Sequence, residues 1–217
     1  MLKVQYGCGL SNPDGWRNYD STPSLLVQKI PLVKLAARTA ETLVGNKNHR
    51  LRLILHNIGN SRASYSNVVK GLPLKNGSVD LLYASHVLEH LPLHEFRAAL
   101  AESLRVLKVG GVFRLVVPNL ETMVSRYIDS NSPTKSIEFC LESGLGSESF
   151  PNPLSRLRGD SHWMMYDKTT LQNELRSAGF TLIEQAYLGS SRYSEFSEVE
   201  DPSRWSYPDN IGFECTK

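Results

Sequence analysis

Short strand-like runs alternate along the chain with longer segments whose apolar residues recur at helical spacing. Nearly continuous apolar runs, such as VDLLYASHV at 79–87, are expected of strands that are buried on both faces of a sheet. Strands are expected at residues 2–6, 16–20, 51–55, 79–87, 112–118, 181–188 and 211–217. Helices are expected at residues 24–44, from Pro92 to the Gly110-Gly111 pair, around 123–128 and at 169–180. This alternation predicts an α/β fold with a doubly wound, Rossmann-like sheet.

Boundary signals sharpen two of these helices. Pro31 should start a second helix within 24–44 or kink the first one, because proline cannot continue a helix. The helix at 169–180 should be closed by Gly179 and capped at its start by Asp167. The basic residues in 24–44 also allow a helix that lies on a membrane surface, but we favour an ordinary amphipathic helix or lid.

Composition and charge narrow the class of protein. The 217 residues suffice for one domain with a full core, so we expect a single domain over residues 1–217. The net charge of +2 gives no broad basic field, so we expect no nucleic-acid partner. Cys8, Cys140 and Cys215 are odd in number and lack metal-type spacing, which favours a reducing compartment. Without a leader-like segment or a membrane-spanning run, the sequence predicts a cytoplasmic protein with no stable membrane insertion. The oligomeric state stays open.

Distinctive residues follow the first two expected strands. Gly7-Cys8-Gly9 ends the first one, and a Gly-x-Gly turn lets the backbone approach a ligand closely, although it can also be a simple tight turn. Asp20 ends the second strand, where a carboxylate can accept hydrogen bonds from both hydroxyls of a ribose. The third glycine of a dinucleotide-binding turn is missing, which disfavours a nicotinamide oxidoreductase. A nucleoside without phosphates, such as S-adenosylmethionine, fits better.

Four successive motifs carry a family resemblance: YGCGLSNPDGWRNYD, VVKGLPLKNGSVDLLYASHVLEHL, RVLKVGGVFRLVVPNLE and SHWMMYDKTTLQNELRSAGF. In this order they resemble class I S-adenosylmethionine-dependent methyltransferases, and they are most similar to the type 11 methyltransferase domain family. The resemblance covers residues 2 to about 188. It implies seven strands with the last one antiparallel, a helical insert or lid at 21–66, a substrate-side insert at 121–167, and a C-terminal tail with the last strand at 189–217.

The resemblance also implies cofactor contacts. They would come from Tyr6, Gly7, Cys8 and Gly9 near the amino-acid part, Asp20 at the ribose, Asn67 and Leu72 at the adenine, and His86 beside the methionine part. Two departures from the family pattern matter. Asn67 stands where the family usually has an aspartate, so the adenine contact should be weaker. Residues 8–15 are too few for the usual crossover helix, so the first crossover should be abbreviated.

The stretch HVLEH at 86–90 matches the H-x-x-E-H pattern of inverted zinc peptidases. Such a site needs both imidazoles on one helical face and a third ligand. Here His86 ends a strand and Pro92 starts the next helix, and no third ligand is evident in the sequence. We therefore expect no metal, and a zinc peptidase remains a remote alternative. His90 either hydrogen-bonds locally or faces a methyl acceptor.

A second histidine, His162, lies just before the helix at 169–180. It either packs in the core beside Trp163 and Tyr166 or acts as a general base for an acceptor hydroxyl. Arg158 and Asp160 could flank His162. Arg204 and Trp205 could close the mouth of the site beside His162 or merely dock the tail.

The sequence thus predicts methyl transfer from S-adenosylmethionine to a small-molecule or glycan-type acceptor, with oxygen as the favoured acceptor atom and His162 and His90 as candidate catalytic residues. The main alternative is a cofactor-binding protein of the same fold without turnover.

Overall fold

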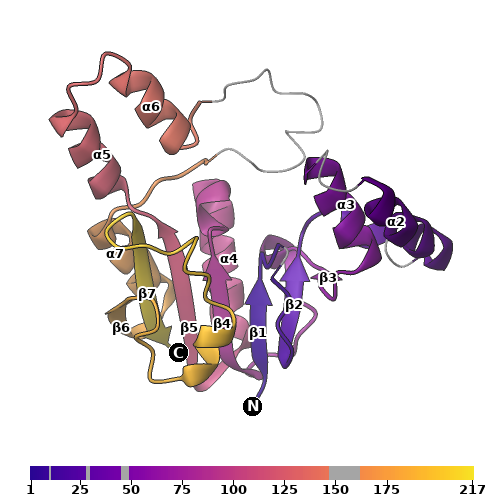
Figure 1. Ribbon diagram of the computed structural model, residues 1–217. Coiled ribbons are helices and arrows are strands. Elements are labelled where there is room, and N and C mark those ends of the chain that lie inside the picture. Colours follow the sequence, from indigo (N-terminus) through magenta and orange to yellow (C-terminus); the bar gives the residue numbers. More distant parts are fainter. Residues whose placement is uncertain (10, 28–29, 45–48, 147–161) are drawn as a thin grey trace.

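A computed structural model describes the chain except for residues 10, 28–29, 45–48 and 147–161 (Figure 1). Across the described residues, seven strands form one sheet in the order β3-β2-β1-β4-β5-β7-β6. The strands are β1 Lys3–Tyr6, β2 Trp16–Asp20, β3 Ser64–Tyr65, β4 Val79–Ser85, β5 Leu107–Pro118, β6 Thr181–Ala186 and β7 Asn210–Thr216. Strand β7 runs antiparallel to both of its neighbours, and the other pairs are parallel. This confirms the doubly wound sheet with an antiparallel last strand.

Helices precede, connect and flank these strands. They are α1 Ser24–Val27, α2 Pro31–Val44, α3 His49–Gly59, α4 Leu93–Val106, α5 Leu120–Asp129, α6 Lys135–Glu142 and α7 Lys168–Ala178, with the short 3-10 turns η1 Val68–Lys70, η2 Leu88–His90 and η3 Ser194–Glu198. Pro31 starts α2, as expected, and α7 has the expected cap and closing glycine, since Asp167 accepts from the Thr170 amide and Gly179 has φ 103°. No helix in the described parts of the chain has the length and apolar character needed to cross a bilayer.

Two sequence-based expectations are wrong. Residues 51–55 were expected to form a strand but lie within α3, because Leu51, Leu55 and Ile58 recur at helical spacing and α3 packs on α2. The Gly110-Gly111 pair does not end a helix either. Helix α4 stops at Val106 and β5 runs through the glycines, which exchange main-chain hydrogen bonds with Lys217. Pairing with the end of the chain therefore decides the structure there.

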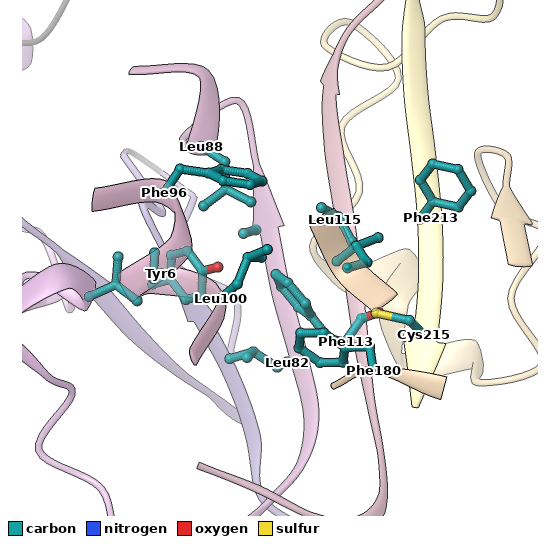
Figure 2. Packing of buried hydrophobic residues seen from close by; sticks show 14 of the residues in the cluster. Tyr6, Leu82, Leu88, Phe96, Leu100, Phe113, Leu115, Phe180, Phe213 and Cys215 are labelled. Carbon is teal, nitrogen blue, oxygen red and sulfur yellow. The ribbon is translucent and has the colours of Figure 1, made fainter. Parts of the chain in front are cut away.

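One face of the sheet is covered by α4, α7 and η1. Its core includes the fully buried side chains of Phe96, Leu100, Phe113 and Phe213, which Figure 2 shows packed between the helices and the strands. Burying each such side chain contributes about 1.5–3 kcal/mol relative to leaving it exposed. This face therefore anchors the strands whose ends form the site.

The opposite face is covered by the C-terminal tail instead of a crossover helix. Residues 7–15 connect β1 to β2, and those of them that the structure describes (7–9 and 11–15) form no helix, which confirms the abbreviated crossover. Phe196 and Trp205 of the tail are buried in one cluster with Trp16 and Tyr83 of the sheet. The Phe196 ring lies 5.9 Å from the Trp16 ring and 6.2 Å from the Tyr83 ring, measured between centroids. Figure 1 shows this orange and yellow tail crossing in front of the sheet. The tail thus supplies the apolar cover that a crossover helix would give.

Candidate active site

The glycine turn after β1 requires glycine for two different reasons. Gly7 and Gly9 both have positive φ angles, 64° and 54°, which side-chain-bearing residues rarely adopt. A Cβ atom at Gly7 would also lie 2.1 Å from the Cγ2 atom of Val87, whereas a Cβ atom at Gly9 would meet nothing within 4 Å. The backbone at Gly7 is therefore packed directly against the chain that follows β4.

Asp20 is tied into this turn. It is 8% exposed, and its Oδ2 atom accepts a hydrogen bond from the Gly9 amide at 2.8 Å. Its Oδ1 atom accepts from the amide of Thr22 at 2.7 Å and from the Thr22 hydroxyl. Each carboxylate oxygen has two lone-pair sites, and among the described residues Oδ2 accepts from the Gly9 amide alone. With respect to those residues, Oδ2 can still accept from a ligand hydroxyl.

A cleft lies between this turn, β4 and the tail. Its lining residues are Gln5, Tyr6, Gly7, Cys8, Ser11, Tyr83, Ser85, Val199, Asp201 and Arg204. The tail residues Val199 and Asp201, which lie in the stretch EVEDPSRW at 198–205, were not among the expected site residues. Trp205 does not close a mouth at His162, because it is buried under the tail against the Arg114 guanidinium. The tail therefore forms one wall of the cleft at the ends of β1 and β4.

Two side chains of the predicted cofactor set point away from this cleft. The Tyr6 hydroxyl lies 3.1 Å from the Ser103 hydroxyl in the core, and burial raises the pKa of Tyr6. Only the main chain of Tyr6 can therefore meet a ligand. The Cys8 thiol is buried near Leu25 of α1, and burial raises the pKa of Cys8 to about 12. Cys8 is accordingly a neutral packing group at neutral pH.

The two residues predicted to contact adenine have structural contacts of their own. The Oδ1 atom of Asn67 accepts from the Val69 amide at 2.8 Å and so caps η1. Its second lone-pair site still permits an adenine contact. Leu72 is 5% exposed and belongs to the core that packs on α4. The adenine contacts of both residues stay predictions.

His86 connects the cleft to a second group of side chains. It has φ 54°, unusual for a residue other than glycine, at the end of β4. Its Nε2 atom lies 2.6 Å from the carbonyl oxygen of Arg204, so Nε2 carries the hydrogen. Its Nδ1 atom lies 3.2 Å from the Oε1 atom of Glu89. His86 therefore touches both the tail and the loop that carries HVLEH.

The structure brings His90 and His162 together, with their ring centroids 4.8 Å apart, next to Glu89. The main-chain carbonyl of Glu89 accepts from the amides of Trp163 and Met164, which holds the two segments side by side. Glu89 is 0% exposed, and neither carboxylate oxygen has a hydrogen-bond partner among the described residues. Among the described residues, the Glu89 side chain therefore caps no helix.

His162 has a defined tautomer. Its Nδ1 atom donates to the carbonyl oxygen of Ser143 at 2.8 Å, which leaves Nε2 as the proton acceptor. Burial lowers the pKa of His162, so the neutral ring is favoured. Trp163 beside it is 67% exposed, so the core-packing interpretation does not hold for this tryptophan. Arg158 and Asp160 lie outside the described residues.

Comparisons with known proteins agree with this geometry. The family model described as "Methyltransferase domain" matches residues 39–115, which include Asn67, Leu72, His86 and His90. No curated protein matches the chain. A S-adenosylmethionine-dependent methyltransferase from Archaeoglobus fulgidus is similar at 16% identity and a TM-score of 0.50, covering 100% of this chain and 87% of that one. A structure of PigF with SAH is similar at 14% identity and a TM-score of 0.51, covering 100% of this chain and 50% of that one.

At these identities the structural likeness shows the fold, while the family model adds the domain to which the middle of the chain is related. Both agree with the resemblance of the sequence motifs. Residues 39–115 thus match a methyltransferase domain, and the chain as a whole shares the fold of these two solved structures.

Proposed function

We propose that this protein transfers a methyl group from S-adenosylmethionine to a hydroxyl of a small-molecule or glycan-type acceptor. The observation that supports this is the grouping of Gly7, Asp20 and His86 at the carboxyl ends of neighbouring strands, with His90 and His162 just beyond β4. Ligands of doubly wound sheets bind at this edge. The whole of 1–217 would then act as one domain, and its free thiols suit a reducing, cytoplasmic compartment.

The residues of the turn fit the cofactor. Gly7 packs against Val87, whereas the space beside Gly9 is open, so the backbone there is accessible to a ligand, and the Asp20 carboxylate suits a ribose hydroxyl. The cofactor supplies a methyl group already activated by its sulfonium. The protein then has to hold the acceptor in line with that methyl group and remove a proton.

His162 suits proton removal. Its Nε2 atom has a free lone pair because Nδ1 donates to Ser143, and burial keeps the ring neutral. The exposed ring of Trp163 offers an apolar surface beside it for the ring of a sugar or aromatic acceptor. The His90 ring lies 4.8 Å from the His162 ring, so His90 can share the proton removal with His162 or carry it out instead.

Calorimetry with S-adenosylhomocysteine tests the cofactor half of the proposal. Asp20→Ala should lose roughly 1.5–3 kcal/mol of affinity, the range for hydrogen bonds to a charged group, or about 10- to 150-fold. Asp14→Ala is the matched control, because Asp14 lies in the loop that leads into β2 and its side chain is 87% exposed. Equal affinity of Asp20→Ala and the parent protein would remove Asp20 from the site.

An acceptor screen that measures released S-adenosylhomocysteine tests the chemical half. His162→Ala should keep cofactor affinity within a few-fold while turnover falls about 10²–10⁴-fold.

The second candidate function is cofactor binding without turnover. Two departures from the family pattern favour it: Asn67 in place of the usual aspartate, and the abbreviated first crossover. Tight cofactor binding with no product from any hydroxyl acceptor would support this second candidate.

A further inference from the structure

We propose that Glu89, His90 and His162 form a binding site for a divalent transition-metal ion of the Zn²⁺ type. One ligand atom from each residue lies within 4.8 Å of the other two. Tetrahedral zinc with bonds of about 2.0–2.1 Å places its ligand atoms about 3.3–3.5 Å apart. Small side-chain rotations therefore bring all three atoms to bonding distance. The proposal concerns ion binding: a bound ion would occupy the Nε2 lone pair of His162, so it would compete with the proton removal proposed above for this histidine.

Glu89 is the residue of this group whose buried carboxylate a bound cation would stabilise most. Its side chain is fully buried, and both oxygens lack a hydrogen-bond partner within the described parts of the chain. Burying a carboxylate without a partner is costly, so buried charges are normally paired or coordinate metals. The amides of Trp163 and Met164 fix the main chain of Glu89, so the carboxylate cannot leave easily for solvent. A bound cation would supply the missing charge.

His162 has the geometry of a metal ligand. Its Nδ1–H group donates to the Ser143 carbonyl, which fixes the ring and directs the Nε2 lone pair away from that contact. Metal-binding histidines almost always donate their other ring N–H in this way. Gly144, with φ 70°, makes room for the ring, since a Cβ atom there would lie 2.8 Å from the Cγ atom of His162. The end of α6 is thus shaped around this imidazole.

His86 also lies against this group. Its Nδ1 atom is 3.2 Å from the Oε1 atom of Glu89, and its Nε2 atom donates to the carbonyl oxygen of Arg204. The contact with the tail therefore holds a further imidazole beside the Glu89 carboxylate.

This site differs from the peptidase arrangement that the motif HVLEH suggested. There, the first and last histidines of the motif bind the metal on one helix. Here, His86 is engaged with the tail, and the fold brings in His162 from a distant part of the chain as the ligand that the sequence did not reveal. Two histidines and one glutamate form a three-ligand set of the kind that leaves a position for water or a substrate oxygen.

Calorimetric titration of dialysed full-length protein with Zn²⁺ tests the proposal. The parent protein should bind one ion per chain, and Zn²⁺ should raise its melting temperature. His162→Ala and Glu89→Gln should each weaken binding at least about 10–100-fold. His94→Ala is the control, because His94 is an exposed histidine of α4 outside the group, and it should bind like the parent.

Three outcomes would overturn the proposal: no stoichiometric binding, equal binding by His162→Ala and the parent, or equal loss in His94→Ala. If Glu89→Gln fails to fold, His162→Ala and His90→Ala decide the matter, with circular dichroism as the check on folding. Affinity for S-adenosylhomocysteine should be retained in the metal-free protein. Loss of zinc binding with intact cofactor binding, or the reverse, therefore separates this proposal from the proposed function.

Discussion

Replacing Arg114 by alanine should loosen the tail that covers the site. Arg114 lies in β5 and is 1% exposed. Its Nε atom donates to Glu200 at 2.5 Å, Nη1 to Glu214 at 3.0 Å and Nη2 to the carbonyl of Tyr187 at 2.6 Å. Its guanidinium carbon lies 4.7 Å from the centre of the Trp205 ring. One buried side chain therefore joins β5, β7 and the tail.

The magnitude follows from the burial of both charges. The side chain of Glu200 is 3% exposed, so Arg114→Ala leaves a buried carboxylate without its counter-charge. Removing one partner of a buried pair costs about 3–5 kcal/mol. For a domain of this size, each kcal/mol shifts the melting temperature by roughly 2–4 °C, so we expect a loss of about 6–20 °C.

Arg97→Ala is the matched control. Arg97 also binds one glutamate with two nitrogens, at 2.9 and 2.7 Å from Glu174, but its side chain is 59% exposed. Exposed pairs contribute about 0–1 kcal/mol, so this variant should melt within a few degrees of the parent. Urea unfolding and scanning calorimetry measure both variants. Losses of similar size in Arg97→Ala and Arg114→Ala would refute the argument from burial.

Further predictions concern the turn, the histidine and the thiols. Gly7→Ala should reduce S-adenosylhomocysteine affinity or folding far more than Gly9→Ala. Both residues have a positive φ, but only at Gly7 would the added Cβ atom also collide with Val87. Equal effects of the two variants in calorimetry would contradict this. Burial lowers the pKa of His162 in the folded state, so the unfolded chain binds the proton more tightly. The free energy of unfolding should therefore fall as pH decreases below the ordinary imidazole pKa of about 6.5. His162→Gln should make this fall smaller in denaturation curves measured at several pH values. Cys140 is exposed whereas burial raises the pKa of Cys8 to about 12, so a thiol reagent at pH 8 should label the former and spare the latter, as peptide mass spectrometry would show.

Much of the fold could be predicted because local signals and tertiary structure agree. Most of the run at 79–87 lies in β4, Val79–Ser85, which is largely buried, and Asp167 and Gly179 bound a helix through their own capping chemistry. The expected strand at 51–55 failed because a short apolar run is ambiguous, and packing against α2 decided it. The expectation that Gly110-Gly111 would end a helix was wrong because these glycines pair with Lys217, at the distant end of the chain.

The site shows where such reasoning stops. Gly7 and Asp20 could be recognised because their function depends on local features: a turn that tolerates no side chain and a carboxylate at a strand end. The role of the tail could not be recognised from local features. It depends on the face of the sheet that no crossover helix covers, and on the buried Arg114, which holds the tail on that face.

The motif HVLEH illustrates the limit most clearly. Its spacing alone predicts two histidines on a helix, and the strand and proline around it argue against that arrangement. What the motif forms instead depends on His162, which approaches Glu89 and His90 only because main-chain hydrogen bonds join residues 163–164 to Glu89 and the end of α6 orients the imidazole. A contact between segments so far apart leaves no periodic or compositional signal in a single sequence. Whether the group binds a cation therefore turns on geometry that only the fold provides, and the zinc titration addresses that geometry directly.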